Sequence, residues 1–438
     1  APFIDCFLLG EAEAVLTAFF TCLVDSGFTS DSGKESCLRT CAQNVPGTYV
    51  PHLYRSTYNR DGTLAAFDPL IDIPAHIECA RSDDLSYLAT CSTVLTPDTT
   101  FDSTYLIEVS RGCPHGCRFC SAGFVYRPAR FRPVTLLQDC MRQGMATTDK
   151  IGLVGAAVSD LPEIKSLCRQ ALENDVTLSF SSLRADALDS DLLAVLHRGG
   201  VKTATIAPDA GSEKMRRVIN KGISEEQILA ATELLVANGI PNLKLYFMVG
   251  LPAETMDDVE EIVSLCRKIK HVFLKSSRHK KRIGEITVSL NSFVPKPATP
   301  FQWVPMDEVA VLKEKIRKVK NGLKKVPNLR VHADVPRWAY VQALLSRGDR
   351  RVADILLLAH KFGGNWPQTL KASPLNPDFY VHRHRSMDEK FPWDFIDHGV
   401  RKSFLAREYK RGLAGKTTPP CPTDQPCSIC GACQDGNT

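Results

Sequence analysis

Three cysteines close together in the first third of the chain are the residues best suited to metal chemistry. They lie in a stretch that we call the cysteine loop (residues 111–120), which reads Arg111-Gly112-Cys113-Pro114-His115-Gly116-Cys117-Arg118-Phe119-Cys120. Spacings of three and two residues let the thiolates converge on a compact iron–sulfur cluster, and the proline and glycine suit a tight loop. A 4Fe-4S cluster normally takes four cysteines, so three leave one iron open. The alternatives are a zinc knuckle, for which His115 is a poorly placed fourth ligand, and reduced structural thiols.

A second group of cysteines lies near the end of the sequence. The cysteine tail (residues 421–433) holds four of them within thirteen residues: Cys421, Cys427, Cys430 and Cys433. Four thiolates can complete either an auxiliary iron–sulfur cluster or a structural zinc site, and the spacing suits both. A cluster could relay electrons, whereas zinc would only hold the tail in place. The need for cluster assembly at the cysteine loop favours iron–sulfur.

Between these groups, short apolar runs alternate with amphipathic stretches. Strands are predicted at residues 104–110, 150–157, 176–182, 203–209, 243–250 and 285–294. Helices are predicted at residues 133–145, 161–173, 189–198, 224–238, 256–275 and 306–325. Six strand–helix units predict an α/β fold, an open partial (β/α)6 TIM-like barrel with its chemistry at the carboxyl ends of the strands. The cysteine loop follows the first strand, where such a barrel places an active site.

The segments on either side of this core divide the chain into three predicted parts. Residues 1–103 begin with a strand, a glycine turn and a helix ending near Asp25, followed by a looped connector over residues 44–103. Residues 104–326 form the barrel. Residues 327–438 form a smaller C-terminal module with a strand at 329–333, helices at 337–346, 350–361 and 398–412, and the tryptophans Trp338, Trp366 and Trp393 as packing anchors.

Composition limits the class of protein. The 438 residues are 44% hydrophobic and 24% charged, which is typical of a globular fold, and the net charge of +5 does not by itself predict nucleic-acid binding. The 16 cysteines fall into two tight groups and scattered singles, such as Cys37 and Cys41, which are predicted to be buried and reduced. A reducing cytoplasm is therefore the expected compartment. We expect no membrane span and no signal peptide.

The cysteine loop resembles the radical S-adenosylmethionine superfamily, whose hallmark is this three-cysteine spacing with an aromatic residue before the last cysteine, here Phe119. The resemblance implies a 4Fe-4S cluster whose open iron chelates the amino and carboxylate groups of S-adenosylmethionine. One electron then releases a 5'-deoxyadenosyl radical that abstracts hydrogen from a substrate. It also implies an electron donor such as flavodoxin or ferredoxin. The substrate, whether small molecule, RNA or protein, and any catalytic side chain acting on it are not identified.

The same resemblance assigns cofactor contacts to the first strand ends. Gly155 and Ala156 stand where the superfamily has a Gly-Gly-Glu-like turn that receives the methionine amino group, although the glutamate is absent here. Ser182 and Arg184 close the third strand, from which related enzymes contact the ribose or the carboxylate. The planar fork of Arg184 suits a carboxylate, while a surface arginine at a helix start is the alternative.

Later strand ends give further implied contacts. Asp209 replaces the glutamate of a Pro-Glu-Ala-Gly-Ser-like turn and is expected to reach the ribose hydroxyls or the methionine ammonium. The turn at Gly250 and Leu251 is expected beside the adenine, and Glu254 with Thr255 is interpreted as the start of a helix. The proline-rich residues 291–303 are expected to cover the barrel mouth and contact substrate.

The opening residues resemble the end of a cobalamin-binding-type domain, with Ala12 replacing the second glycine of a Gly-Glu-Gly-Glu-like turn. An ordinary strand, turn and helix is the alternative. Three reactions stay open: cobalamin-assisted methyl transfer, radical modification of RNA or protein, and another hydrogen abstraction. The competing hypothesis from a different class is a non-catalytic iron–sulfur protein that transfers electrons.

Overall fold

Two parallel sheets form the centre of the structure, and their strands follow one another in chain order. This computed structural model describes residues 3–27, 33–180, 184–278, 283–422 and 427–433. The first sheet has the order β6-β9-β10, and the second has the order β11-β12-β13-β14. The strands are β6 (Tyr105–Glu108), β9 (Lys150–Val154), β10 (Thr177–Phe180), β11 (Thr203–Asp209), β12 (Asn242–Val249), β13 (Ile286–Ser292) and β14 (Leu329–Ala333).

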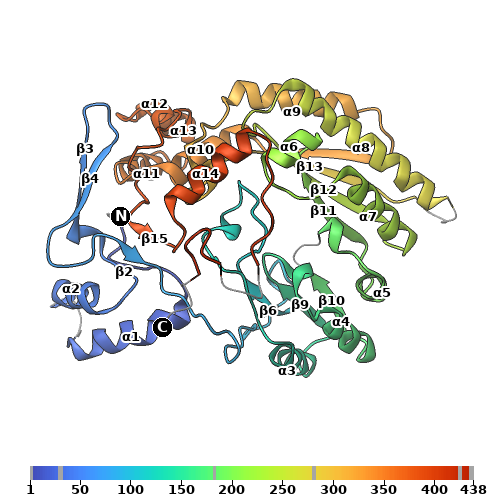
Figure 1. Ribbon diagram of the computed structural model, residues 1–438, viewed down its shortest axis with the longest axis horizontal. Coiled ribbons are helices and arrows are strands. Elements are labelled where there is room, and N and C mark those ends of the chain that lie inside the picture. The colour runs from blue at the N-terminus through green and yellow to red at the C-terminus, as the bar shows by residue number, and fades with distance from the viewer. Residues whose placement is uncertain (1–2, 28–32, 181–183, 279–282, 423–426, 434–438) are drawn as a thin grey trace.

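Helices cover the outer side of both sheets (Figure 1). They are α3 (Val134–Met145), α4 (Ile164–Glu173), α5 (Ser190–Arg198), α7 (Glu225–Ala237), α8 (Met256–Ser277) and α9 (Val309–Leu323), with the short α6 (Glu213–Val218) after β11. Alternate residues of β12, including Leu245 and Phe247, are fully buried against this layer. Capping boxes at Ser224 and Thr255 start α7 and α8 by satisfying backbone N–H groups that the first helical turn leaves free.

The predicted α/β alternation is confirmed, but two details differ. Among the described residues no ladder joins β10 to β11, so the strands form two sheets instead of one continuous barrel wall. The strand at 329–333, which the sequence assigned to the C-terminal module, is β14 and pairs in parallel with β13. It extends the sheet because its first residue, Leu329, packs into the main core.

The N-terminal segment begins with the predicted strand, glycine turn and helix. Here β1 (Phe7–Leu8) pairs with β2 (Thr48–Tyr49), and Gly10, with φ +114°, leads into α1 (Ala12–Asp25). The helix α2 (Lys34–Asn44) follows, and it buries Cys37 and Cys41 as predicted. The connector then forms the hairpin of β3 (Tyr54–Tyr58) and β4 (Leu64–Pro69), and the short β5 (Ile77–Glu78).

The C-terminal module packs against both other parts. It contains α10 (Pro336–Arg347), α11 (Val352–Lys361), α12 (Trp366–Ala372), α13 (Asp378–Val381), β15 (Ile396–Asp397), which pairs with β5, and α14 (Lys402–Leu413). The prediction that Trp338 anchors this module is wrong, because its side chain lies at an open groove and is 52% exposed. Trp303 is the buried anchor instead, and its ring packs on those of Phe391 and Tyr409.

All 16 cysteines carry free thiols. In the part of the chain that the structure describes, we find no helix that combines the length and the apolar character needed to span a bilayer.

Candidate functional site

The cysteine loop leaves the carboxyl end of β6 and is closed at its base by a short ladder. That ladder pairs β7 (Ser110–Arg111) with β8 (Arg130–Phe131). Gly112 has φ +77°, and the carbonyl of Tyr126 occupies the space that a side chain at this position would need. Within the loop the N–H of Cys120 donates to the carbonyl of Cys117 at 3.0 Å. The turn therefore depends on glycine and on a local hydrogen bond.

The three loop thiols lie within electrostatic range of one another. Cys117 is buried, and this burial raises its pKa to about 12, against the opposing charge of Lys221. Burial also raises the pKa of Cys113. Iron binds cysteine as the thiolate, so iron binding must displace the thiol protons of Cys113 and Cys117. In the described ranges, no three His, Cys, Asp or Glu side chains lie close enough to share one metal ion. A 4Fe-4S cluster does not require this, because each cysteine binds a different iron.

A lysine that the sequence analysis missed, with its side chain 12% exposed, lies within electrostatic range of Cys117. Lys221 Nζ lies 2.6 Å from Asp209 Oδ2. Burial lowers the pKa of Lys221, but the charges of Asp209 and Cys117 outweigh burial and raise it, so the lysine stays protonated. The carboxylate of Asp209, expected to reach the cofactor, is engaged by this lysine. A single lysine after a short helix carries no sequence signal, and only the fold brings it to the thiols.

Arg184 also lies near the loop, where its charge acts on Cys113 and Cys117. Its guanidinium binds Asp186 through two hydrogen bonds, Nε to Oδ1 at 3.0 Å and Nη2 to Oδ2 at 2.9 Å. Part of the guanidinium group that was expected to bind the carboxylate of the cofactor is therefore already engaged by Asp186. Ser182, the other residue assigned to this strand end, lies outside the described residues.

Several polar groups at the strand ends lack partners. The hydroxyl oxygens of Ser110 on β7, Ser159 in the turn after β9 and Ser292 at the end of β13 are buried and make no hydrogen bond within the described structure. Such groups are costly unless something binds them. Gly155 lies beside Ser110, because a Cβ on Gly155 would come within 2.7 Å of Ser110 Oγ. The neighbouring Ala156 is exposed.

The turn after β12 is held by a buried carboxylate. Glu254 Oε2 accepts the N–H of Gly250, which has φ +86°, at 2.7 Å, and it lies 2.9 Å from Lys315 Nζ. Burial raises the pKa of Glu254, and Lys315 opposes the rise. Thr255 caps α8 as predicted, but Glu254 folds back onto this turn instead of starting the helix. Leu251 is buried in the core, so only its backbone can face a ligand.

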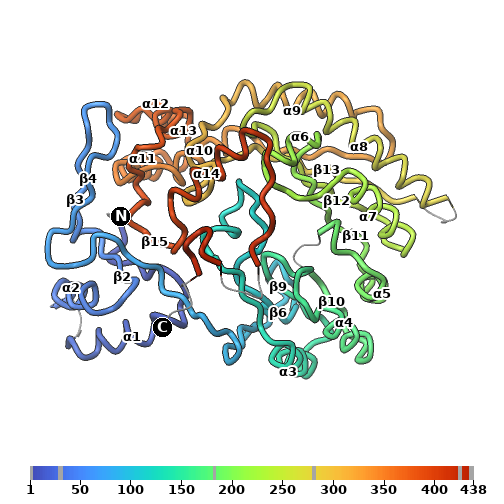
Figure 2. The backbone as a smooth tube through the Cα atoms, in the orientation of Figure 1, coloured from blue at the N-terminus to red at the C-terminus, as the bar shows by residue number. Residues whose placement is uncertain are grey.

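The segment leading into the cysteine tail packs directly on the cysteine loop (Figure 2). The N–H of Cys421 donates to the carbonyl of Pro114 at 2.7 Å. The side chain of Asn220 joins the two segments, donating to the carbonyls of Gly116 at 3.1 Å and Thr418 at 3.0 Å and accepting the N–H of Thr418 at 2.8 Å. The sequence analysis did not predict that the two cysteine groups meet.

A buried ion pair reinforces this junction. Arg118, whose side chain is fully buried, lies 3.0 Å from Glu408 on α14 and donates to the carbonyl of Lys416 at 2.7 Å. Thr418 Oγ1 donates to the same carboxylate at 2.8 Å. The arginine in the middle of the loop therefore holds the segment that carries the tail.

The described part of the tail lines one side of an open cavity of about 230 Å³, and α14 with residues 418–420 lines much of the rest. Its lining includes Cys421, Cys427 and Cys430, with the cationic side chains of Arg127, Arg407 and Arg411 around them. Burial raises the pKa of Cys421, and the thiol of Cys433 lies within its electrostatic range. The cationic lining suits a site whose thiolates carry negative charge.

Two carboxylates of the N-terminal turn bind the first residue of the cysteine loop. Arg111 lies 3.0 Å from Glu11 and 2.5 Å from Glu13, and it also pairs with Glu108 at 3.0 Å. On the other side of the base, Arg130 pairs with Glu11 at 2.5 Å. The turn that resembles the end of a cobalamin-binding-type domain thus contacts the base of the loop.

The loop is also tied to the segment after β9. His115 Nε2 lies 3.0 Å from Asp160 Oδ2, so this histidine is engaged by a carboxylate. The loop is therefore held on four sides, by the N-terminal turn, by the segment after β9, by Asn220 and by the segment leading into the tail.

Comparison with known proteins gives a family match over the region that contains the loop. Residues 107–266 match the family model described as the Radical SAM superfamily. The chain is 37% identical over 258 residues to an uncharacterized protein of Methanocaldococcus jannaschii, covering 58% of this chain and 54% of that one. It is 24% identical over 281 residues to the anaerobic magnesium-protoporphyrin IX monomethyl ester cyclase of Rubrivivax gelatinosus, covering 61% and 45%. The chain spans about half the length of these curated relatives.

Among solved structures, one similar chain is the radical S-adenosylmethionine methyltransferase TsrM from Kitasatospora setae, with cobalamin and a 4Fe-4S cluster bound. The TM-score is 0.42 at 15% identity, over 66% of this chain and 53% of that chain.

Proposed function

We propose that the chain is an enzyme that reductively cleaves S-adenosylmethionine, because residues 107–266 match the family model of the Radical SAM superfamily. Cys113, Cys117 and Cys120 would hold the 4Fe-4S cluster. When bound, the reduced cluster would pass one electron to S-adenosylmethionine, whose cleavage to methionine would supply a 5'-deoxyadenosyl radical for hydrogen abstraction. The chain's own part is to bind, orient and shield these groups.

The residues around the loop fit such a cofactor. Lys221 is charged, largely enclosed and within electrostatic range of Cys117, and it can offset the negative charge that iron, sulfide and thiolates bring together. The unpartnered hydroxyls of Ser110, Ser159 and Ser292 can donate to the polar groups of S-adenosylmethionine. The single observation that carries the proposal is this combination of three thiols, one buried cation and unsatisfied hydroxyls at the strand ends.

The cysteine tail is proposed to hold a second iron–sulfur cluster rather than zinc. We favour iron–sulfur because the cluster proposed for the cysteine loop already requires cluster assembly, whereas the spacing of the tail cysteines suits either kind of site. Contact of the tail with the cysteine loop supports a role in electron transfer to or from the first cluster.

The class of reaction and the electron donor are also proposals. Hydrogen abstraction with cobalamin-assisted methyl transfer is one candidate, supported by the N-terminal turn at Glu11 and Glu13. An external reductant such as flavodoxin or ferredoxin would supply the electron. A non-catalytic electron-transfer protein is the competing function, and it predicts neither binding nor cleavage of S-adenosylmethionine.

The test is anaerobic reconstitution of the full chain with iron and sulfide. Iron per chain is then counted, and 5'-deoxyadenosine is measured after addition of dithionite and S-adenosylmethionine. Product together with about eight irons supports two four-iron clusters, and product with about four irons leaves the tail to zinc. Cluster-loaded, folded protein that neither binds nor cleaves S-adenosylmethionine contradicts the enzyme and supports the electron-transfer function.

A further inference from the structure

Two buried arginines of the C-terminal module lie close together with little negative charge around them. Arg347 ends α10 and Arg385 follows α13, and the two residues are only 1% and 2% exposed. Arg385 Nη2 donates to the carbonyl of Arg347 at 2.9 Å. A cation that is taken out of water destabilises the fold unless a negative charge accompanies it.

The carboxylates that act on Arg385 are largely engaged by other arginines. Glu389 binds Arg383 through two hydrogen bonds of 2.7 Å, whereas its nearest approach to Arg385 Nη1 is 3.9 Å. Asp349 lies 2.6 Å from Arg351. Neither carboxylate is therefore free to neutralise the buried pair.

The two guanidinium groups keep their charge in spite of this surrounding. Burial, followed by the charges of Arg385 and Arg383, lowers the pKa of Arg347 to about 9. Burial is also the main cause that lowers the pKa of Arg385 to about 10. Both values are above 7, so both side chains are cations at neutral pH. The interior at this point carries an excess of positive charge.

Several N–H groups of the same cluster are buried and have no hydrogen-bond partner within the described structure. They are Nε and Nη2 of Arg347, Nε of Arg385, Nε of Arg383, and Nε1 of Trp303, whose side chain is fully buried. Backbone contacts bring three of these residues together. The N–H of Arg385 donates to the carbonyl of Trp303 at 3.1 Å, and Arg347 Nη1 donates to the carbonyl of Val304 at 2.7 Å.

The chemistry of these unpartnered atoms points to the kind of ligand. Each of them is a donor, and a buried donor without an acceptor is costly. A buried water molecule makes about three hydrogen bonds and must donate as well as accept, so a group of donors alone does not satisfy it. An anion only accepts, and it also supplies the missing negative charge.

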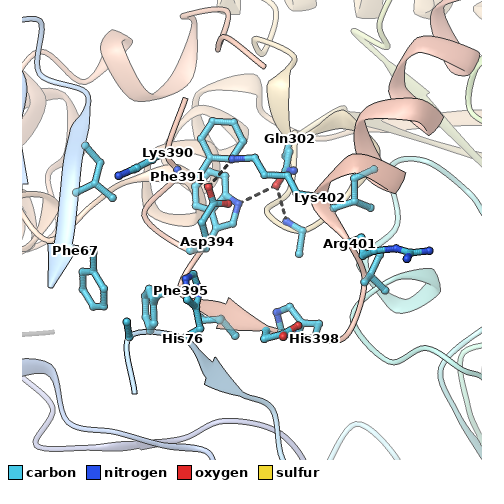
Figure 3. A pocket seen from close by; sticks show the side chains of 18 of the residues that line it. Phe67, His76, Gln302, Lys390, Phe391, Asp394, Phe395, His398, Arg401 and Lys402 are labelled. Carbon is cyan, nitrogen blue, oxygen red and sulfur yellow. Dashed lines mark hydrogen bonds and ion pairs between the residues drawn. The ribbon is translucent and has the colours of Figure 1, made fainter. Parts of the chain in front are cut away.

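The space around the cluster favours a small ion. A neighbouring cavity of about 570 Å³ has Phe391 and Gln302 on its wall (Figure 3), and the guanidinium carbon of Arg385 lies 5.4 Å from the ring centroid of Phe391. Neither Arg385 nor Arg347 is among the described residues that line this cavity or the cavity at the tail. A site that these cavities do not reach suits a monatomic ion better than phosphate or an organic carboxylate.

We propose that Arg347, Arg385 and Trp303 bind one halide ion, which is chloride under ordinary conditions. The ion accepts their free N–H groups and offsets the excess of positive charge. Trp303 belongs to the loop after β13, whereas Arg347 belongs to α10. The ion therefore fastens this loop to the C-terminal module, and the site does not depend on the proposed radical function.

Bromide can replace chloride, and anomalous diffraction can locate it. Crystals of the reconstituted full chain grown in sodium bromide should show an anomalous peak in contact with both guanidinium groups and with Trp303 Nε1. The peak should be present above the bromine absorption edge and absent below it, which distinguishes bromide from iron. Arg347→Met, which removes one cation and its donors, should lose the peak.

Stability in urea gives a second readout. The equilibrium constant for unfolding should fall along a single-site curve as chloride replaces gluconate at constant ionic strength, by about tenfold at ten times the dissociation constant. Arg347→Met should be equally stable in both salts. Arg347→Lys keeps the charge but not the planar set of donors, so it should keep only part of the chloride effect. Arg216→Met is the matched control, because Arg216 is similarly buried but pairs with Glu213 at 2.7 Å, and it should keep the full effect.

The absence of a bromide peak, or an ordered water molecule in its place, would overturn the proposal. A peak in a wild type that is equally stable in chloride and gluconate would mean an adventitious ion only and would overturn it too. A chloride effect retained by Arg347→Met would place the ion elsewhere in the molecule. If Arg347→Met does not fold, Arg347→Lys decides the question, because an undiminished chloride effect in that variant contradicts the site.

Discussion

The cysteine loop and the cysteine tail lie against each other, yet they are positioned by different means. The loop begins at Arg111 in β7, and the chain after it returns through β8, which pairs with β7. The strand before the loop, β6, belongs to a parallel sheet. The tail has neither helix nor strand among its described residues, 421–422 and 427–433. Its position depends on polar contacts made by Arg118, Asn220 and Arg401, whose N–H donates to the carbonyl of Cys430 at 2.9 Å.

This difference has an energetic consequence. A loop anchored by backbone ladders on both sides keeps its place when a single side chain changes. A tail fixed by a few buried side-chain contacts depends strongly on each one, because breaking a buried contact leaves its partner unsatisfied. A metal bound at the tail, as proposed, should therefore be lost after single substitutions that the loop tolerates.

The largest effect is expected from Cys117→Ala. Without this thiolate the loop cluster cannot assemble, so 5'-deoxyadenosine formation should fall below detection and about four irons per chain should be lost. The tail should keep its iron, as measured by iron counting and electron paramagnetic resonance. The matched control is Cys168→Ala on α4, a buried cysteine far from either group in sequence, which should keep both clusters. Equal loss of iron from both sites would show that they are not independent.

The next effect concerns the ion pair between the loop and α14. Arg118→Met removes the closer cation of Glu408 and leaves this buried carboxylate with Arg411, 3.6 Å away, as its remaining cation. We expect unfolding in urea to become easier by about 3–5 kcal/mol, the usual cost of breaking a buried pair. Iron should be lost first from the tail. A change below about 1 kcal/mol would mean that the pair is solvated and does not hold the tail.

The double variant Arg118→Met with Glu408→Leu sharpens this result. Removing both charges leaves no orphan carboxylate, so we expect much of the lost stability to return. Tail iron should not return with it, because the hydrogen bonds to Lys416 and Thr418 are still missing. Full recovery of tail iron would mean that another contact positions the tail.

A smaller effect is expected at Asn220. Its φ is +54°, so Asn220→Gly removes the side chain without straining the backbone. Loss of its hydrogen bonds to Gly116 and Thr418 should cost about 1–3 kcal/mol, observed as faster proteolysis of the segment after α14. Asn220→Asp separates the two kinds of contact, because it keeps the acceptor for the N–H of Thr418 but places a carboxylate oxygen against the carbonyls of Gly116 and Thr418, so it should protect no better than Asn220→Gly. Equal proteolysis of wild type and Asn220→Gly would refute this role.

Much of the fold was predictable because it follows from local periodicity. β11 begins at Thr203 and ends at Asp209, the predicted bounds, and the other predicted barrel helices and strands were found within a few residues. The two cysteine groups could be recognised because their members are close in sequence, and their metal binding stays a prediction. Thr255 was predictable as a helix start because capping is a local interaction.

The rest could not be predicted because it depends on contacts between residues far apart in sequence. The pairing of Arg118 with Glu408 spans 290 positions, and no pattern in either segment indicates the other. The same holds for Lys221, whose role appears only when β11 brings Asp209 beside Cys117. Trp338 was misjudged because sequence gives residue type but not which helix face stays open.

The smallest effect tests how firmly the N-terminal turn is attached to the loop. Glu13 pairs with Arg111 at 2.5 Å, and its side chain is 30% exposed. We expect Glu13→Gln to lower the free energy of unfolding by about 0.2–1 kcal/mol at pH 7, as for other partly exposed pairs. Glu35→Gln is the matched control, because Glu35 forms a pair with Arg39 at 3.5 Å that is largely exposed and should contribute nothing measurable.

The pH dependence separates this ion pair from a packing effect. The hydrogen bond from Arg111 is the main cause that lowers the pKa of Glu13 in the folded chain. A carboxyl group with a lowered folded pKa stabilises the fold above its unfolded pKa of about 4.3, and this contribution is lost as the pH falls through the folded value. Pulse proteolysis in urea should therefore show a stability difference between wild type and Glu13→Gln at pH 7 that shrinks at pH 4 and below. A difference that does not change with pH would mean that the glutamine disturbs packing and that the charge of Glu13 contributes nothing.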